Sequence, residues 1–195
     1  MLRAVCTDST NLPIVAGNLE GIEFWPRWSA EGIEGRQYIE PDVFMQFCNF
    51  DLIIEAKKGD DGGQYNEQWI NQIRAYCNEM KDDRELFYIT LGGNSDKLND
   101  RVEVSYNTDE KIQKITTTIN KCDWMSLLIE ITTLKSQLKT VSTSISSHDA
   151  ILRLLDDIIA SFNYHGFYNV KWFKNLTYKS VNNESIETLS SLPNF

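Results

Sequence analysis

Residues 38–57, Tyr38-Ile39-Glu40-Pro41-Asp42-Val43-Phe44-Met45-Gln46-Phe47-Cys48-Asn49-Phe50-Asp51-Leu52-Ile53-Ile54-Glu55-Ala56-Lys57, decide the fold of this chain. Residues 36–47 alternate apolar and polar side chains and contain β-branched and aromatic residues, a pattern typical of a half-buried strand. Residues 50–57 are more continuously apolar, which predicts a more buried strand. Because only Cys48 and Asn49 separate the two, we expect them to form a hairpin.

The length of this connection determines which residues face one another. With a two-residue link Phe47 faces Phe50, and counting back along both strands places Asp42 directly opposite Glu55. Glu40 would face Lys57 under the same rule. A link of odd length would shift the pairing by one residue and turn these side chains apart.

Two facing carboxylates predict a bound cation. Directly opposed residues have Cβ atoms about 4.5–5.5 Å apart, and like charges so placed destabilise the sheet. Alternation also puts Lys57 on the same face as Glu55. A site of oxygen ligands without histidine or thiolate suits Mg²⁺, or Mn²⁺, better than zinc. We expect Asp42, Glu55 and the Ala56 carbonyl to hold the metal.

Beyond the hairpin, the pattern predicts further alternation of strands and helices. Residues 58–63 are expected to form a flexible loop, residues 64–80 an amphipathic helix, and residues 86–91 a strand. From about residue 109 onward we expect predominantly helical structure. The segment up to residue 35 is expected to contain turns and a short strand.

Capping signals divide the helical part. Asp123 is expected to cap one helix, and Ser146 a second helix that runs from about Asp149 to Phe162. His165-Gly166 should end that second helix. The polar, serine-rich tail from residue 182 is expected to be mobile.

Composition places the chain among globular proteins of one domain. The 195 residues are 42% hydrophobic and carry a net charge of −9, which gives no general attraction for a polyanion. No apolar run is long enough for a membrane span. The cysteines, which include no CxxC pair, are expected to be free in a reducing cytoplasm. They are Cys6, Cys48, Cys77 and Cys122.

Pro41-Asp42 followed by Glu55-Ala56-Lys57, on consecutive predicted strands, resembles the PD-(D/E)XK nuclease superfamily. The resemblance covers roughly residues 20–95 and implies a restriction-endonuclease-like α/β fold, with a mixed central sheet of four or five strands flanked by helices. A C-terminal helical pair, within about residues 109–180, would pack against the sheet. The core, the helical part and the tail at 182–195 then form a single domain.

The resemblance also implies a function. The chain would be a Mg²⁺-dependent nuclease that hydrolyses phosphodiester bonds in DNA, endonucleolytically, with RNA not excluded and a role in restriction or anti-phage defence. Lys57 would act as catalytic base or phosphate contact. The family often places a glutamine of the following helix near the metal, which here implies Gln68 or Gln64. Substrate candidates are Gln64, Gln72, Lys58 and Arg36. The family's additional N-terminal acid lies on a helix and would correspond to Glu20 or Glu23, although this segment lacks a clear helical pattern.

Several alternatives stay open from the sequence. Lys57 and Glu40 could form an ordinary cross-strand ion pair, and the glutamines could line a solvent-facing side of the helix. His148 and His165 suit capping or surface roles better than catalysis. Trp25-Pro26-Arg27-Trp28 could stack on bases, although core packing is favoured.

The whole chain could also be a catalytically silent nuclease fold that serves as a binding or assembly subunit. Because the net charge is acidic, we expect either a homo-oligomer or a partner protein that supplies nucleic-acid recognition.

Overall fold

A computed structural model describes most of the chain. It covers residues 6, 12–13, 17–59, 62–80, 84–107, 112–140 and 146–168. The predicted tail from residue 182 lies outside the described residues, as do parts of the first 16 residues and of the predicted loop at 58–63. Among the helices that are described, none combines the length and apolar content that crossing a membrane requires.

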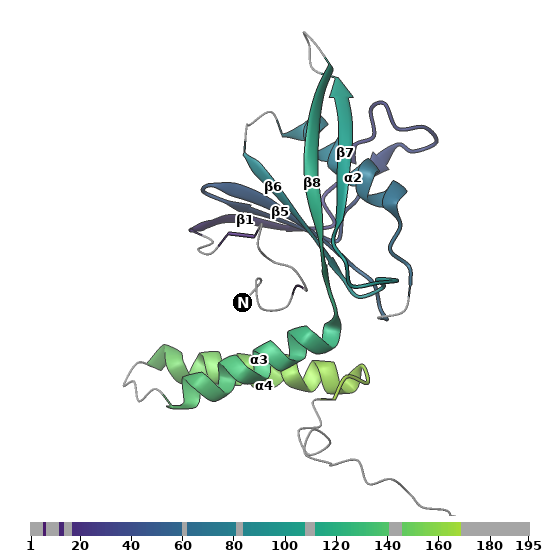
Figure 1. Ribbon diagram of the computed structural model, residues 1–195. Helices are drawn as coiled ribbons and strands as arrows, with labels where there is room; N and C mark the ends of the chain where they lie inside the picture. The colour runs from purple at the N-terminus through teal and green to yellow at the C-terminus, as the bar shows by residue number, and fades with distance from the viewer. Residues whose placement is uncertain are drawn as a thin grey trace, which may run out of the picture.

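Six strands form one mixed sheet in the order β1-β4-β5-β6-β8-β7 (Figure 1). Strands β5, β6 and β8 run parallel to one another, and β1, β4 and β7 pair antiparallel with their neighbours. The chain is therefore an α/β protein, as expected, with more strands than the four or five that were predicted. The strands are β1 (Leu19–Phe24), β4 (Val43–Phe47), β5 (Phe50–Ala56), β6 (Glu85–Leu91), β7 (Asp100–Asn107) and β8 (Ile112–Cys122).

The hairpin has the register that the short link predicts. Val43 pairs with Ile54, and Gln46 pairs with Asp51, so the connection is Cys48-Asn49. The prediction of one continuous strand over residues 36–47 is wrong, because the chain leaves the main sheet before Asp42. Residues Tyr38–Ile39 form β3, which pairs instead with β2 (Trp28–Ser29) in a small second sheet. Pro41 lies in the break, since it has no N–H to donate to a ladder.

Helix α2 (Asn66–Glu79) covers one face of the main sheet and confirms the helix predicted at 64–80. Its Trp69, Ile73 and Tyr76 are buried in one cluster with Phe44 and Ile53. Ile73 and Ile53 are fully buried, and each such side chain contributes about 1.5–3 kcal/mol by leaving water. This packing fixes the helix over the strands that carry the candidate site.

The tryptophan-rich segment before β3 divides between core and surface. Trp28 belongs to the α2 cluster, where its ring meets the edge of Phe44 at a centroid distance of 5.1 Å. Trp25 is 63% exposed and has a positive φ of 51°. The expected core role therefore holds for Trp28 and fails for Trp25.

Strand β8 corrects the expectation of helical structure from about residue 109, and β7, which precedes it, was not predicted. Val102 and Val104 of β7 are buried, while the residues between and around them are exposed. This alternation has the period of a strand, as does the β-branched run of Thr116, Thr117 and Thr118 in β8. The long antiparallel pairing of the two strands gives each of them its stability.

The helical pair is present, but it extends away from the sheet (Figure 1). Helices α3 (Trp124–Thr140) and α4 (Ser146–Tyr164) lie side by side beyond the end of β8, and Lys135 forms an ion pair with Asp156 between them. Leu127, in the first turn of α3, packs on the sheet's second apolar cluster, around Leu52 and Phe87. The expected packing of the pair against the sheet is thus limited to the start of α3.

The predicted ends of these helices agree with the structure. Asp123 precedes α3, and its Oδ1 accepts the Ser126 N–H at 2.6 Å, as an N-cap does. Helix α4 ends before His165-Gly166, where Gly166 has a φ of 89°. Ser146 is the first residue of α4, and its side chain lies outside what the structure describes.

We expect Asp123→Ala to lower the free energy of unfolding by about 1 kcal/mol, because it removes the cap of α3. Urea unfolding followed by circular dichroism measures this. The matched control is Gln137→Ala on the exposed surface of the same helix, which should change stability by less than about 0.5 kcal/mol. Equal losses for the two variants would contradict the capping role.

The expectation of four free cysteines is wrong for two of them. Cys6 and Cys122, the last residue of β8, form a disulfide. The same two residues also pair as an isolated antiparallel β-bridge. The two residues are 116 positions apart in sequence, so their meeting depends on the tertiary fold. Cys48 is free and exposed, and Cys77 is free and half-buried.

Thiol titration of the unreduced protein should therefore find two reactive groups after denaturation, and four after reduction. In the folded protein at pH 8 we expect Cys48 to react first, because burial raises the pKa of the Cys77 thiol to about 11. Labelling with a maleimide followed by peptide mass spectrometry identifies the sites. Four thiols in unreduced, denatured protein would refute the disulfide.

Candidate active site

Asp42, Glu55 and Lys57 come together where the hairpin meets the rest of the sheet. Asp42 immediately precedes β4, Glu55 lies near the end of β5, and Lys57 follows β5 directly. The Oδ2 atom of Asp42 accepts the Ala56 N–H at 2.8 Å. The strand register and this hydrogen bond thus bring Asp42 beside the Glu55-Ala56 peptide, as the hairpin geometry predicts.

Glu55 is a buried carboxylate, with only 2% of the residue exposed. The Lys57 ammonium donates to its Oε1, and the Gln68 amide donates to the same oxygen at 2.6 Å. The Gln72 amide donates to Oε2 at 2.7 Å. A buried charge of this kind is tolerated only when it is hydrogen-bonded and balanced, which these three groups accomplish.

The alternative of a cross-strand ion pair between Lys57 and Glu40 is wrong. Glu40 accepts a hydrogen bond from Arg27 at 3.2 Å in an exposed pair. Lys57 is directed to Glu55 instead, with its side chain 28% exposed. Lys57 therefore pairs with the buried Glu55 carboxylate, and part of its side chain stays exposed to solvent.

The two helix glutamines face the sheet. Gln72 is itself 2% exposed, and the Tyr88 hydroxyl of β6 donates to its Oε1. This bond leaves the Gln72 amide nitrogen directed at Glu55. Burial, followed by the negative charges of Glu55 and Asp42, raises the pKa of Tyr88 well above its ordinary value, so the hydroxyl keeps its proton.

Gln64 has a different position from the one expected. It precedes α2, and its amide nitrogen donates to the backbone carbonyls of Glu55 at 3.1 Å and Gly92 at 3.2 Å. Its Oε1 accepts the Trp69 indole N–H at 3.0 Å. Gln64 therefore ties α2 to the ends of β5 and β6, whereas Gln68 and Gln72 contact the Glu55 carboxylate.

The backbone of Lys57 is held by groups that the sequence did not indicate. Its N–H donates to the Leu91 carbonyl at 2.9 Å, and its carbonyl accepts the Trp124 indole N–H at 2.6 Å. Gly93, with a φ of 66°, lies so close that an added Cβ would come within 2.7 Å of the Lys57 Cβ. The Gly92-Gly93 pair after β6 was a visible signal of such a close approach.

A polar row crosses the sheet beside the site. Glu55 pairs with Thr90 of β6, and Thr90 pairs with Lys121 of β8. The Lys121 ammonium is buried and donates to Asp96 and Asp100, at 2.8 Å each. Burial lowers the pKa of Lys121, but these two hydrogen bonds outweigh it and leave the pKa raised. Lys121 was not predicted as a site residue, because it lies in a strand that was expected to be helical.

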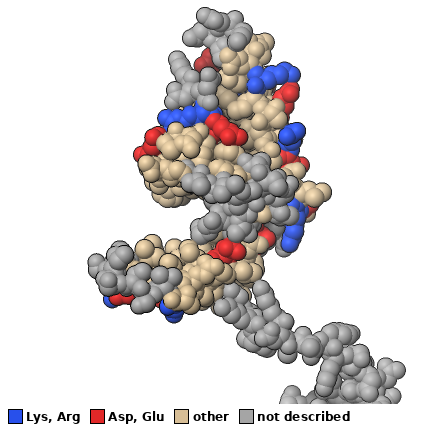
Figure 2. Space-filling model, turned by 60° about the vertical axis from the view of Figure 1, so that its left-hand side comes forward, with Lys and Arg blue, Asp and Glu red and all other residues tan. Residues whose placement is uncertain are grey.

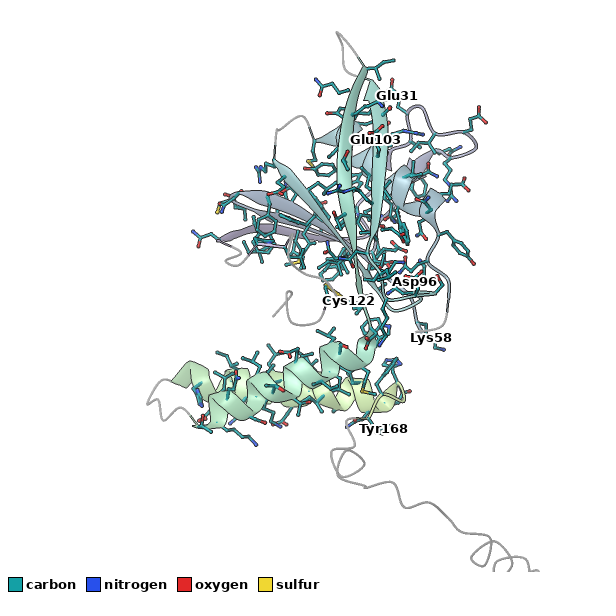
Figure 3. The ribbon with its side chains drawn as sticks, viewed as in Figure 1. Glu31, Lys58, Asp96, Glu103, Cys122 and Tyr168 are labelled. Carbon is teal, nitrogen blue, oxygen red and sulfur yellow. A yellow bond between two sulfur atoms is a disulfide. The ribbon has the colours of Figure 1, made fainter. Side chains whose placement is uncertain are left out.

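The remaining candidates lie around the site or apart from it. Arg36 borders a cavity of about 330 Å³ that Gln68 and Gln72 also line. Lys58 is exposed just after Lys57, at the end of the sheet that also carries Asp96 and Cys122 (Figure 3). Glu20 pairs with Arg84, at the opposite end of β5, at 3.2 Å.

Glu23 is exposed on β1, without a described contact to the site, and does not join it either. His148 and His165 belong to the helical pair, at the start and just past the end of α4.

The donor set is compatible with a hard divalent cation. The protein would contribute the Asp42 and Glu55 carboxylates and the Ala56 carbonyl, and Mg²⁺ commonly binds one or two carboxylates while keeping several waters. Among the described residues, no three His, Cys, Asp or Glu side chains gather into a metal-binding group. Two carboxylates are therefore all that the described side chains offer here.

Comparison with known proteins assigns no activity to this site. No protein-family model matches the chain. The chain is 28% identical over 175 residues to an uncharacterized protein of Pasteurella multocida (strain Pm70). The match covers 87% of this chain and 64% of that protein, so the chain spans less than two thirds of its relative's length.

We expect Gln72→Ala to lower the free energy of unfolding by about 1–3 kcal/mol, because it leaves both the Glu55 Oε2 and the Tyr88 hydroxyl buried without this partner. Tyr88→Phe should cost about 1 kcal/mol, and the double variant less than the sum of the two. Urea unfolding measures all three. Tyr106→Phe, which removes a 2.7 Å bond to Gln113, is a matched Tyr–Gln control in a less buried place. A strictly additive double variant would show that Tyr88 and Gln72 are not coupled.

Proposed function

We propose that this chain is a metal-dependent nuclease that hydrolyses phosphodiester bonds in DNA. The observation that carries the proposal is the buried Glu55 carboxylate, which is hydrogen-bonded by both Lys57 and Gln68. Asp42 lies beside this residue, since its Oδ2 accepts the N–H of Ala56 at 2.8 Å. Buried acids are energetically costly, so a fold that keeps one beside a second acid and a lysine has a chemical use for it.

The two acids are the proposed metal ligands. Asp42 and Glu55, with the Ala56 carbonyl, would hold Mg²⁺ or Mn²⁺. When bound, such a cation stabilises charge on the phosphate oxygens and lowers the pKa of its water. Gln68 and Gln72 then act as positioning residues, because they orient the carboxylate of Glu55 without facing the phosphate.

Lys57 is the proposed catalytic base or phosphate contact. Its ammonium reaches Glu55 from the solvent side, so it adjoins the position where a phosphate would meet the two acids. A lysine in this place can orient or deprotonate the attacking water and stabilise the charge that develops in the transition state. Both acts need Lys57 to stay near the carboxylates, which its backbone bonds to Leu91 and Trp124 ensure.

The surface charge indicates that DNA binding would depend on phosphate contacts close to the site. The face drawn in Figure 2 carries Lys, Arg, Asp and Glu side chains interspersed, without one broad basic strip. With a net charge of −9, long-range attraction of DNA is weak. We therefore propose that Arg36 and Lys58 contact the strand near the site, and that a homo-oligomer or a partner protein adds further affinity. A role in restriction or anti-phage defence stays a prediction.

The direct test is cleavage of plasmid, linear DNA and RNA in Mg²⁺, Mn²⁺ or EDTA. We expect metal-dependent cleavage of DNA, with Glu55→Ala inactive and Lys57→Ala slower by about 10²–10⁴-fold. The matched controls are Glu103→Ala and Lys114→Ala, which break an exposed Lys–Glu pair at 2.7 Å elsewhere on the sheet and should cleave normally.

Metal binding supplies a second readout. Mg²⁺ should raise the melting temperature of the wild type, because it binds only the folded site, and it should not do so for Glu55→Ala. Cleavage that persists in both Glu55→Ala and Lys57→Ala would contradict the assignment of the active site to these residues. Absence of cleavage in every metal, with no Mg²⁺ binding by calorimetry, would instead support a silent binding or assembly subunit.

A further inference from the structure

The cavity beside Gln68 and Gln72 is the feature that goes beyond the metal site. It has a volume of about 330 Å³ and lies between the N-terminal half of α2 and the segment around β3. Gln68 forms part of its wall while donating to the Glu55 carboxylate. Any group that occupies the cavity therefore lies next to the proposed position of the scissile phosphate.

Three side chains that line the cavity have no described role in holding the fold together. Tyr65 is 66% exposed, and although it precedes α2 its side chain makes no capping hydrogen bond. Asn71 and Arg36 also line the cavity, and neither side chain has a hydrogen-bond partner within the described part of the chain. A ring, an amide and a guanidinium are thus all presented to a ligand.

These groups match the parts of one nucleotide. An exposed tyrosine ring stacks on a base, and an amide can pair with the edge of that base. The Arg36 guanidinium can bind a phosphate of the same strand. Glu40 and Glu67 also line the cavity, so its interior suits a neutral base better than a phosphate.

The size of the cavity restricts the occupant further. A volume near 330 Å³ is at the lower end of the range for small-molecule sites, so it takes one nucleotide and not a base pair. Inside a duplex a base is stacked on both sides and cannot reach a protein ring. Only an unpaired or extruded nucleotide can enter.

We propose that this cavity binds one unpaired nucleotide of a DNA strand, stacked on Tyr65 and adjacent to the scissile phosphate. The inference rests on the proposed nuclease function and adds the strand state of the substrate to it. It makes single-stranded DNA, or a strand that leaves a duplex at a flap or overhang, the preferred substrate.

The test is fluorescence anisotropy with a labelled DNA strand of roughly 12 nucleotides and with its duplex, at one fixed salt concentration. Ca²⁺ replaces Mg²⁺, so that binding is measured apart from turnover. We expect the single strand to bind more tightly than the duplex. Tyr65→Ala should weaken single-strand binding by about 5-fold to 100-fold, as the loss of one stacked base predicts, and leave duplex binding unchanged.

Two further variants separate stacking from loss of structure. Tyr65→Phe keeps the ring and should bind as the wild type does. Tyr164→Ala removes an equally large ring that is 87% exposed at the end of α4, and should have no effect. Single-strand binding that is unchanged in a folded Tyr65→Ala protein, or a duplex preferred by the wild type, would overturn the proposal.

Failure of this inference and failure of the nuclease assignment give different results. Metal-dependent cleavage and single-strand binding that do not change in Tyr65→Ala would contradict nucleotide binding in the cavity and still support the nuclease function. Tyr65-dependent binding of a single strand, without cleavage in any metal, would keep the cavity as a single-strand binding site and remove the catalytic assignment.

Discussion

The carboxylate of Glu55 is almost completely removed from water, and the local structure is organised around satisfying it. Lys57 balances its charge, and Gln68 and Gln72 occupy its oxygens from α2. Because the Tyr88 hydroxyl in turn donates to Gln72, the hydrogen-bond network around Glu55 extends into β6, the next strand of the sheet. Each partner belongs to a different element or to a different turn of the helix, so their alignment fixes α2 over β5 and β6. The site and the core are therefore parts of one packing arrangement.

Local pattern was sufficient to predict the hairpin, its register and the helix after it. The connection Cys48-Asn49 is short enough to leave few alternatives, and the stripe of Trp69, Ile73 and Tyr76 has a clear helical period. Asp123 marks the start of α3 and Gly166 the end of α4. Both act through near neighbours in sequence, which is why their positions could also be predicted. The clustering of the two acids, the lysine and the glutamines could be predicted because all of them lie close to this hairpin in sequence.

Contacts between distant segments could not be predicted in the same way. The bridge between Cys6 and Cys122 and the indole bond from Trp124 to Lys57 both join residues that the sequence separates widely. Strand β7 was not predicted although Val102 and Val104 alternate with polar residues. Strand β8 was missed because the chain from about residue 109 was expected to be helical. That error also hid Lys121, whose place in the row of Glu55 and Thr90 depends on β8 being a strand. The role of Gln64 was likewise decided by which backbone carbonyls the fold places near it.

The Trp124 indole connects the helical pair to Lys57, the proposed catalytic lysine, by a direct hydrogen bond. Trp124 is the first residue of α3, and its ring also packs against Phe162 and Phe167 at the far end of α4. The Trp124 side chain thus packs against the end of α4 and donates a hydrogen bond to the Lys57 carbonyl at the same time. A change in the packing of the two helices would therefore change the surroundings of the Lys57 carbonyl. The helical pair is therefore structurally coupled to the candidate site through the side chain of Trp124.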